Sequence, residues 1–237
     1  MTGLAQTKKV KTTAIKALKK TPKTSPKNKV PPPLFQSGTV PLVVLDANIL
    51  IPEYLRAVFL DLGDAGLLRP YWSAEILKEV RRNLISPKFG LSPVNVDHML
   101  ACMKTAFPDA LVQGYQKLEK QFALTVDKKD LHVAAAAWRL SQHAYGGQSV
   151  VLATSNMKDL PNAAFTNTQV TSARPDRVLQ DLLTIYRAEL PVVLKAMCKR
   201  FKKPAIAQED LLGILENSQC KGFAAKLAAA WGFKPEV

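Results

Sequence analysis

The sequence predicts an α/β protein, built as a doubly wound parallel sheet flanked by helices and followed by an α-helical extension. Short apolar runs of strand length, at residues 42–45 and 149–153, alternate with segments of helical periodicity. Strands that alternate with helices in this way are typical of a parallel sheet. Beyond Arg174-Pro175, in contrast, the apolar pattern has the spacing of helices throughout.

The lysines are concentrated at the start of the chain. Residues 1–40 contain nine lysines and no acid, so only +5 of the formal net charge of +14 belongs to the remainder. A segment rich in Lys, Thr and Pro cannot bury enough apolar surface to offset its chain entropy. We therefore predict a disordered tail at residues 1–39, as a solvating leader or a nonspecific nucleic-acid arm. A sheet domain at 40–188 and a helical extension at 189–237 follow.

The composition favours a protein that folds around one core in a reducing compartment. A chain of 237 residues, 47% of them hydrophobic, is long enough to fold alone. Its three cysteines, Cys102, Cys198 and Cys220, lack the spacing of metal ligands, and we expect them to be reduced. No run approaches the roughly 18 apolar residues that span a bilayer. We therefore expect no membrane association and a cytoplasmic location.

The first half of the sheet domain is predicted to be mostly helical after its first strand. Residues 53–66 carry an apolar stripe of helical spacing that ends at Gly66, and residues 69–72 form a short second strand. Ser73 is a good N-cap for a helix over residues 74–85. Two more helices are then expected, one beginning at Ser92-Pro93 and running to about 107, and one over residues 109–122.

The second half of the sheet domain contains one long helix and two strands. Residues 128–143 are strongly helical, and Gly146-Gly147 ends that segment. Residues 149–153 form a buried strand, and residues 169–171 a last short one. The extension is then predicted to hold helices at 176–188, 191–201, 209–216 and 220–231.

A run of basic residues lies in the extension. Its members are Lys195, Lys199, Arg200, Lys202 and Lys203. Charged helix faces are common and are usually just solvated. The functional alternative is a contact with an RNA backbone.

Four acidic residues lie near the ends of predicted elements. Asp46 ends the first strand, Glu79 lies on the helix after the second strand, Asp130 begins a helix, and Asp159 follows the strand at 149–153. Each has an ordinary explanation, as an Asx-turn, a solvated helix residue, or part of a capping box with Asp127. Because the carboxyl ends of parallel strands share one rim of a sheet, the four side chains can also converge.

Converging carboxylates repel one another and raise each other's pKa unless a cation lies among them. Oxygen ligands without clustered cysteine or histidine favour Mg²⁺, with Mn²⁺ as the other candidate, over zinc. The histidines His98, His132 and His143 are isolated in the sequence, so we expect structural roles for them. The predicted metal ligands are Asp46, Glu79, Asp130 and Asp159.

Four motifs, in order, resemble those of the PIN-domain family. They are Val44-Leu-Asp46-Ala-Asn48-Ile-Leu, Ser73-Ala-Glu-Ile-Leu-Lys-Glu79-Val, Asp127-Lys-Lys-Asp130-Leu-His-Val-Ala-Ala-Ala and Leu152-Ala-Thr154-Ser-Asn156-Met-Lys-Asp159-Leu-Pro. The resemblance covers about residues 41–185. The helical end, with Leu211-Leu212 and Phe223-Ala-Ala-Lys-Leu, is similar to the C-terminal extension in one branch of VapC-like toxins.

The resemblance implies a Mg²⁺-dependent endoribonuclease that acts as the toxin of a type II toxin–antitoxin pair. Asp46, Glu79 and Asp130 match the positions of the family's acidic triad, and Asp159 matches the fourth acid of this branch. Many relatives carry an acid where this chain has Asn156. Either Asn156 or Asp159 is therefore expected to support the metal.

The resemblance also implies two supporting residues and the partners. Thr154 matches a polar position near the water at the metal, and Asn48 one that steadies the first aspartate. We expect hydrolysis of an RNA phosphodiester by a water whose pKa one or two ions lower. The implied partners are the RNA substrate, a cognate antitoxin that covers the acidic cleft, and a second copy of the chain in a homodimer.

Two other functions compete with this one. The domain could be a catalytically silent PIN-fold module that binds nucleic acid or protein and keeps its acids for capping and solubility. The other is phosphotransfer chemistry with a strand-end aspartate as nucleophile. That chemistry typically needs a second acid two residues after Asp46, where this chain has Asn48.

Overall fold

The computed structural model describes residues 32–36, 38–143 and 148–233. The residues from Pro33 onward form one compact unit. Most of the predicted disordered tail, and the pair Gly146-Gly147, lie outside the described residues.

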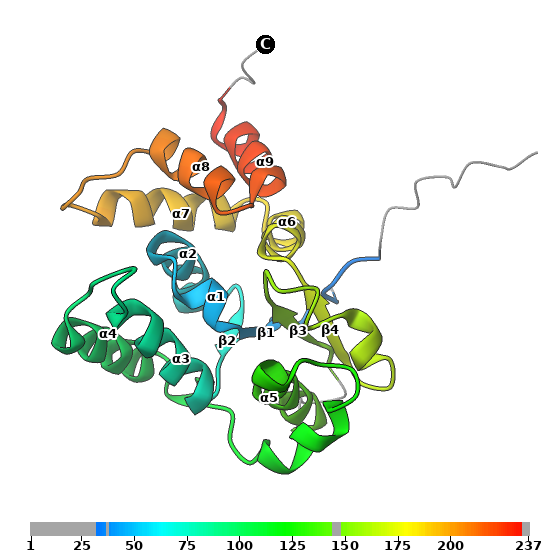
Figure 1. Ribbon diagram of the computed structural model, residues 1–237. Helices are drawn as coiled ribbons and strands as arrows, with labels where there is room; N and C mark the ends of the chain where they lie inside the picture. Colours follow the sequence, from blue (N-terminus) through cyan, green and yellow to red (C-terminus); the bar gives the residue numbers. More distant parts are fainter. Residues whose placement is uncertain (1–31, 37, 144–147, 234–237) are drawn as a thin grey trace, which may run out of the picture. The chain divides into compact units, whose positions relative to one another are not determined.

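The described residues contain one sheet of four parallel strands, as predicted (Figure 1). In chain order the strands are β1 (Leu42–Leu45), β2 (Arg69–Tyr71), β3 (Val150–Ala153) and β4 (Val170–Ala173). Their spatial order is β2-β1-β3-β4, so the chain leaves β1 toward one edge and later returns to add β3 on its other side. The carboxyl ends of β1 and β3 therefore flank a topological switch point, where ligands bind in open α/β sheets.

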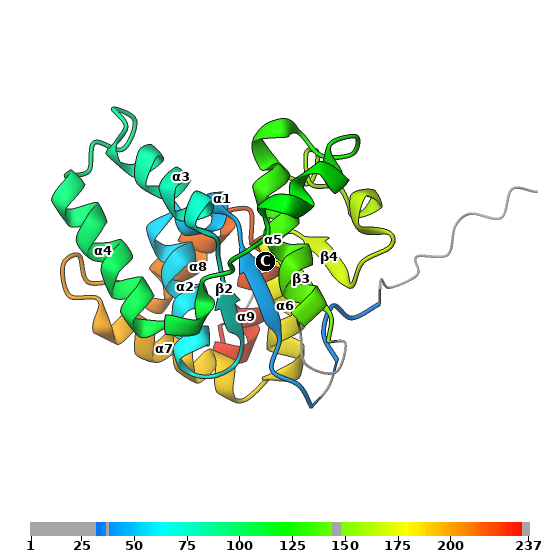
Figure 2. The ribbon, with the colours of Figure 1, turned by 90° about the horizontal axis from the view of Figure 1, so that it is seen from below.

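Helices cover both faces of the sheet, which explains why every residue of β1 and β3 is buried. The helices α2 (Glu53–Asp64) and α6 (Pro175–Ile185) lie on one face, and α3 (Ala74–Ile85) and α5 (Leu131–His143) lie on the other (Figure 1). A short helix, α1 (Ala47–Leu50), follows β1 directly at the carboxyl rim (Figure 2).

The predicted helix start at Ser73 is confirmed, whereas the cap at Ser92 is confirmed only in position. The Ser73 hydroxyl accepts a hydrogen bond from the backbone N–H of Ile76 at 3.1 Å. Ser92 is the N-cap residue of α4 (Pro93–Ala106), but its side chain makes no capping hydrogen bond. At the end of α2, Gly66 has a φ of +72°, the left-handed conformation that favours glycine after a helix.

The prediction of a helix over residues 109–122 is wrong. Two short 3₁₀ segments, η1 (Pro108–Ala110) and η2 (Gln116–Phe122), stand in its place. Between them the backbone pairs with Trp72, which donates to the Ala110 carbonyl and accepts from Val112 N–H, both at 2.9 Å. These bonds to the end of β2 hold the intervening residues extended, so tertiary pairing overrides the local helical pattern.

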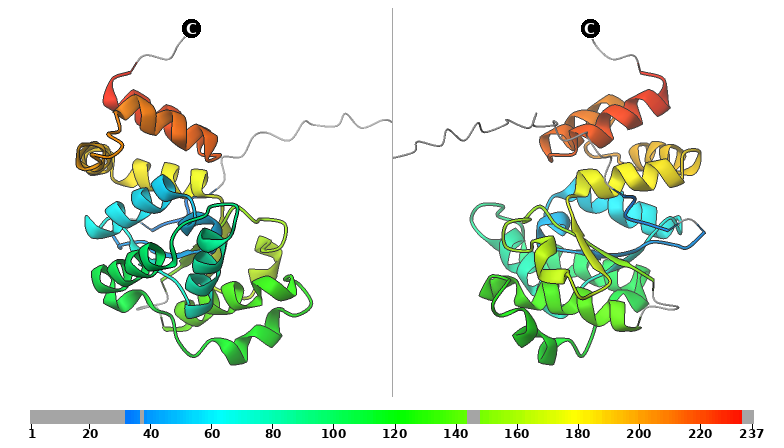
Figure 3. Two further views of the ribbon diagram at one scale, coloured as in Figure 1. Left: turned by 60° about the vertical axis from the view of Figure 1, so that its left-hand side comes forward. Right: turned by 90° about the vertical axis from the view of Figure 1, so that its right-hand side faces the viewer.

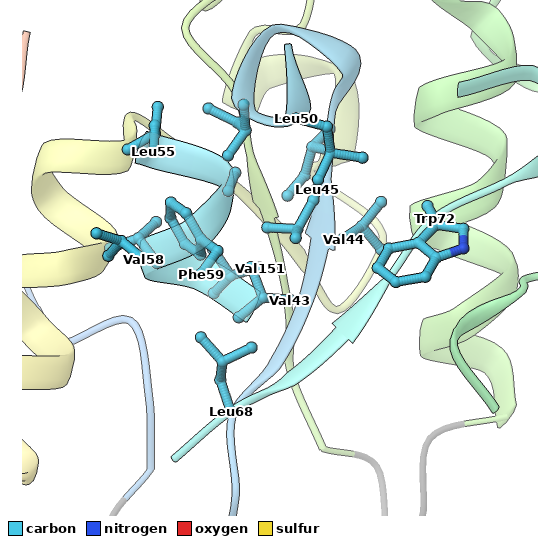
Figure 4. Close-up of a cluster of buried hydrophobic side chains, with 14 of the residues drawn as sticks. Val43, Val44, Leu45, Leu50, Leu55, Val58, Phe59, Leu68, Trp72 and Val151 are labelled. Atoms are coloured by element: carbon cyan, nitrogen blue, oxygen red, sulfur yellow. The ribbon is translucent and has the colours of Figure 1, made fainter. Parts of the chain in front are cut away.

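Figure 4 shows the apolar core on both sides of β1. Phe59 and Leu68 pack near Val43, and Trp72, which is fully buried, lies beside Val44 (Figure 4). The Trp72 ring meets Phe107 edge-on, with ring centroids 6.0 Å apart. This packing anchors β1, and with it the position of the residue that ends the strand.

The four helices predicted for the C-terminal part are confirmed. After α6 come α7 (Glu189–Arg200), α8 (Gln208–Asn217) and α9 (Lys221–Trp231), stacked over the face that carries α2 and α6 (Figure 3). Asp176 of α6 accepts a hydrogen bond from the backbone N–H of Phe223 at 2.7 Å. Arg200 of the basic run donates to both carboxylate oxygens of Asp61 at 2.6 Å, so it connects α7 to α2.

The three cysteines are free, as expected. Cys102 is exposed, whereas Cys198 and Cys220 are buried. Burial raises the pKa of the Cys220 thiol to about 12, which keeps it protonated and unreactive. Among the described residues, the structure contains no helix that is both long and apolar enough to cross a membrane.

Candidate active site

The site is built where β1 and β3 end. Asp46 adds one hydrogen bond to the pairing of β1 with β3, because its backbone N–H donates to the Ala153 carbonyl at 3.1 Å. The carboxylate of Asp46 caps the N-terminus of α1, because Oδ1 accepts a hydrogen bond from Ala47 N–H at 2.6 Å. The capping role expected for a strand-end aspartate is therefore real. It uses one carboxylate oxygen, Oδ1.

The second carboxylate oxygen of Asp46 is held by two polar side chains. Thr154, the residue after β3, donates from its hydroxyl to Oδ2 at 2.7 Å, and Asn48 donates to the same atom from Nδ2. Asn48 is itself oriented, because its Oδ1 accepts from the backbone N–H of Ser155 at 2.9 Å. The structure thus places both predicted supporting residues against Asp46.

A pocket of about 570 Å³ opens beside these groups. Three of the four predicted acids line it: Asp46 from the end of β1, Glu79 from α3, and Asp130 from the 3₁₀ turn η3 (Lys128–Asp130) that leads into α5. The described residues that line the pocket are Asp46, Asn48, Glu75, Lys78, Glu79, Arg82, Lys129, Asp130, His132 and Asn156. Asp159 lies outside this set.

The electrostatics of the pocket favour a cation. The pKa of Asp46 is raised from its ordinary 3.8 to about 6, chiefly by burial. The hydrogen bonds from Thr154 and Ala47 oppose this rise, and the negative charges of Glu79 and Asp130 add smaller contributions to it. Burial also raises the pKa of Asp130, with Asp159 and Glu79 adding to the effect and Lys129 opposing it. Carboxylates in this condition gain most from a bound cation.

The side chains fit a hydrated Mg²⁺ better than an ion enclosed by protein ligands. In the part of the chain that the structure describes, no three carboxylate, imidazole or thiol groups are close enough to hold one ion together. Mg²⁺ is usually bound by one or two carboxylates and keeps several waters. The pocket supplies oxygen ligands and room for such waters, whereas a structural zinc ion needs four converging protein ligands.

Asp159 and Asn156 are placed differently from the other predicted residues. The Asn156 side chain spans two carboxylates, because Nδ2 donates to Asp130 at 3.1 Å and to Asp159 at 3.0 Å. Asp159 also pairs with Lys129, whose Nζ is 3.1 Å from Oδ2. The hydrogen bond from Asn156, followed by that from Lys129, lowers the pKa of Asp159. The negative charge of Asp159 is thus already paired with a positive charge of the same chain.

The local capping pattern around Asp130 is only half formed. Asp127 is the N-cap of η3, and its Oδ1 accepts from Lys129 N–H at 3.1 Å. The carboxylate of Asp130, in contrast, accepts from Asn156 and lines the pocket. Asp130 is therefore oriented toward the site as well as placed in the first turn.

Several residues of the pocket were not predicted from the sequence. His132, which we expected to be structural, lines it with Nε2 buried and 4.0 Å from Glu79 Oε2. Glu75 also lines it, four residues before Glu79 on the same face of α3. That i, i+4 spacing was a usable signal for Glu75. For His132 the sequence held no comparable signal, because only the packing of α5 against α3 brings it to Glu79.

Replacing Thr154 with Val tests whether its hydroxyl controls Asp46. We expect the pKa of Asp46 to rise, because a hydrogen bond that stabilises the carboxylate is lost. We expect the free energy of unfolding to fall by about 1–3 kcal/mol, because a buried carboxylate loses a donor. Carbon-13 NMR titration of the carboxyl groups and urea denaturation measure the two effects. Thr154→Ser keeps the hydroxyl and should resemble the parent; an unchanged Asp46 pKa in the valine variant would contradict the assignment.

Comparison with known proteins finds a matching family model and a similar relative. The family described as the VapC50 C-terminal domain matches residues 175–229, the segment from the start of α6 into α9. A Mycobacterium tuberculosis protein named "Putative ribonuclease VapC50" is 33% identical over 117 residues. That match covers 49% of this chain and 63% of the relative, so less than two thirds of the relative's length is spanned. No solved structure matches the chain.

The resemblance to VapC proteins rests on the fold, the pocket and the two comparisons. The parallel sheet has the predicted order of elements, and three of the acids that the PIN-like motifs single out line one pocket at its rim. The helices that follow match the C-terminal domain of a named VapC, and the relative at 33% identity bears the same name. The chain therefore resembles VapC-like PIN-domain proteins, and its residues 175–229 match the VapC50 C-terminal domain.

Proposed function

We propose that the protein is a metal-dependent endoribonuclease. The observation that carries the proposal is the pocket in which carboxylates from three separate elements, Asp46, Glu79 and Asp130, face one space. Grouping acids in this way is unfavourable without a cation. The pKa of Asp46 is raised mainly by burial, and the charges of Glu79 and Asp130 add to that rise. The name of the relative, a ribonuclease, supports the choice of reaction.

Mg²⁺, or Mn²⁺ in its place, would lower the pKa of the attacking water and neutralise charge on the phosphate when bound. We propose that Asp46 and Asp130 hold the ion and that Glu79 completes its surroundings or orients the water. Asn48 and Thr154 keep the Asp46 carboxylate in place through their hydrogen bonds. Asn156 does the same for Asp130.

Basic side chains at the pocket are suited to the RNA backbone. Lys78, Arg82 and Lys129 all line it beside the acids. Contacts between such side chains and phosphates position a nucleic acid without selecting its sequence. Selection would then depend on bases in single-stranded or looped RNA, which can be splayed out and read.

A Mg²⁺ titration followed by thermal unfolding tests the metal site without relying on activity. We expect Mg²⁺ at about 100 times its Kd to raise the free energy of unfolding of the parent by about 2.7 kcal/mol. Glu79→Gln should lose much of that gain, because a pocket carboxylate is neutralised. Glu216→Gln, an exposed position on α8, is the matched control and should behave like the parent.

The same proteins then test the reaction. The parent should cut single-stranded RNA with Mg²⁺ and stop when EDTA is added, and Glu79→Gln should be strongly impaired. A catalytically silent binding module would bind RNA or protein with no Mg²⁺-dependent stabilisation and no cleavage. Observing that combination in the parent would favour the alternative function over the one proposed.

We also propose that the protein is the toxin of a type II toxin–antitoxin pair, restrained by an antitoxin and assembled as a homodimer. The support is the match of residues 175–229 to the VapC50 C-terminal domain and the similarity to a relative named "Putative ribonuclease VapC50". Expression of the parent should arrest growth, and co-expression of a neighbouring small gene should relieve the arrest. Light scattering of the pure protein measures the number of copies. Growth unaffected by the parent, with RNA cleavage intact in vitro, would remove the toxin role alone.

A further inference from the structure

Lys129 and Asp159 form an ion pair at the edge of the acidic pocket. Lys129 Nζ lies 3.1 Å from Asp159 Oδ2, and Lys129 lines the pocket while 66% of its side chain remains exposed. Lys129 directly precedes Asp130 in the chain, and Asn156 hydrogen-bonds to both Asp130 and Asp159. The pair is therefore connected to the pocket through the backbone of η3 and through one amide side chain.

The contacts of Asp159 differ from those of the acids inside the pocket. Oδ2 of Asp159 faces two donors from the same chain, the Lys129 ammonium and the Asn156 amide. Asp46 and Asp130 line the pocket and are hydrogen-bonded to neutral groups. A carboxylate that already has a lysine partner has less need of a metal ion than one that has none.

We propose that Lys129 contacts a phosphate of the substrate, and that Asp159 is a positioning residue that acts through Lys129 rather than a metal ligand. The proposal rests on the proposed ribonuclease function. It replaces the expectation that Asp159 binds the metal, and it gives Lys129, which the sequence analysis did not single out, a role in substrate binding.

The chemistry of the two groups supports these roles. An ammonium carries three N–H donors, so a bond to one carboxylate oxygen leaves donors for a phosphate. Lysine is a common phosphate ligand, acting as a point charge. A polyanion that approaches Asp46, Glu79 and Asp130 meets repulsion, which a cation at the pocket edge reduces. Holding the flexible Lys129 side chain beside Asp159 lowers the entropy cost of placing that cation.

Kinetics with a short single-stranded RNA test the role of Lys129. We expect Lys129→Ala to raise KM about tenfold, as for the loss of one charged hydrogen bond, with little change in kcat. Lys129→Arg should restore most of the affinity, because it keeps a cation there. Lys128→Ala removes the neighbouring exposed lysine, which is outside the pocket, and serves as the control.

Binding measurements separate this inference from the proposed reaction. In an Asp46→Asn background, fluorescence anisotropy reports RNA affinity without cleavage. Removing Lys129 there should weaken binding and reduce the slope of log K against log salt by about 0.7, the value for one phosphate contact with a single strand. If the parent never cuts RNA, the proposed function fails. If it does cut RNA while Lys129→Ala matches it in KM and in salt slope, only the inference fails.

A double-mutant cycle tests the role of Asp159. We expect Asp159→Asn to raise KM when Lys129 is present and to have no further effect in the Lys129→Ala protein, because the two residues act as a unit. The Mg²⁺-dependent rise in melting temperature should be the same in Asp159→Asn and in the parent. If Asp159→Asn loses that rise, whether or not Lys129 is present, then Asp159 is a metal ligand and the proposal is overturned.

The cycle also detects the opposite role for Lys129. If the lysine were an internal counter-ion that competes with the metal, Lys129→Ala would bind Mg²⁺ more tightly and cut RNA faster than the parent. Either result would overturn the proposal. Because Lys129 is largely exposed, its substitution should leave the melting temperature without Mg²⁺ unchanged, so these comparisons are made on folded protein.

Discussion

Asp46→Asn is expected to cut RNA at least about 100-fold more slowly than the parent, because even residues that only orient metal ligands are worth 10- to 100-fold. Asp46 is placed at the centre of the site by four interactions: the sheet bond of its backbone and the hydrogen bonds from Ala47, Asn48 and Thr154. The amide of asparagine keeps the size of the side chain but removes the charge that would hold Mg²⁺. Cleavage of a labelled single-stranded RNA measures the effect.

The same substitution is expected to remove the pH dependence that Asp46 gives to the stability of the metal-free fold. The folded-state pKa of Asp46 is about 6, against an ordinary value of 3.8. Between these values the folded protein holds a proton that the unfolded chain has released, so stability falls as pH rises through this window. Above about pH 6 Asp46 is ionised in both states, and the folded protein bears the full free-energy cost of the buried charge. For this pKa shift the cost is about 1–3 kcal/mol. Below pH 3.8 the carboxyl is protonated in both states and the cost disappears.

Urea denaturation in EDTA at pH 4 and at pH 7.5 measures this linkage. The difference in stability between Asp46→Asn and the parent should shift in favour of the variant by about 1–3 kcal/mol from pH 4 to pH 7.5. The hydrogen bonds that asparagine loses to Thr154 or Asn48 change both values by a similar amount and do not affect this shift. Asp64→Asn, an exposed aspartate at the end of α2, is the matched control. An Asp46→Asn protein that cuts RNA as well as the parent would refute the proposed site. One whose stability falls between pH 4 and pH 7.5 as much as that of the parent would refute the electrostatic account of the pocket.

Phe223→Ala is expected to lower the free energy of unfolding of the whole compact unit by about 3–5 kcal/mol, the usual cost of truncating a buried phenylalanine. Phe223 is fully buried in α9, and its backbone N–H is bonded to Asp176 of α6. The helix α6 also contacts β3. Because α6 packs against both the sheet and α9, the extension should unfold together with the sheet.

Hydrogen exchange and circular dichroism, measured across a urea titration, test this cooperativity. The amides of β1 and β3 should lose protection in the same transition in which the helices melt, and Phe223→Ala should shift both to lower urea. Lys226→Ala, exposed on the same helix, should leave the midpoint unchanged. Separate transitions, with the sheet amides unaffected by Phe223→Ala, would show that residues 189–237 fold independently. The boundary predicted at residue 188 would then mark a true domain border.

The sequence by itself determined the features that depend on local chemistry. The apolar run at Leu42–Leu45, the cap at Ser73 and the four C-terminal helices were predictable, because hydrophobic periodicity and side-chain capping act within a few residues. The parallel arrangement followed from the alternation of strands and helices. The shared rim was predictable for the same reason, and with it the meeting of Asp46, Glu79 and Asp130 at one pocket.

Only the tertiary structure decided which side chains meet across that rim. Residues 111–112 are extended because Trp72 offers them backbone partners, Asp159 pairs with Lys129, and His132 reaches Glu79. Spacing along a chain sets the direction of a side chain relative to its own helix or strand, but the rotation and depth of each element come from how the core packs. That packing separates an acid that faces the pocket, such as Asp130, from one that pairs with a lysine at its edge, such as Asp159.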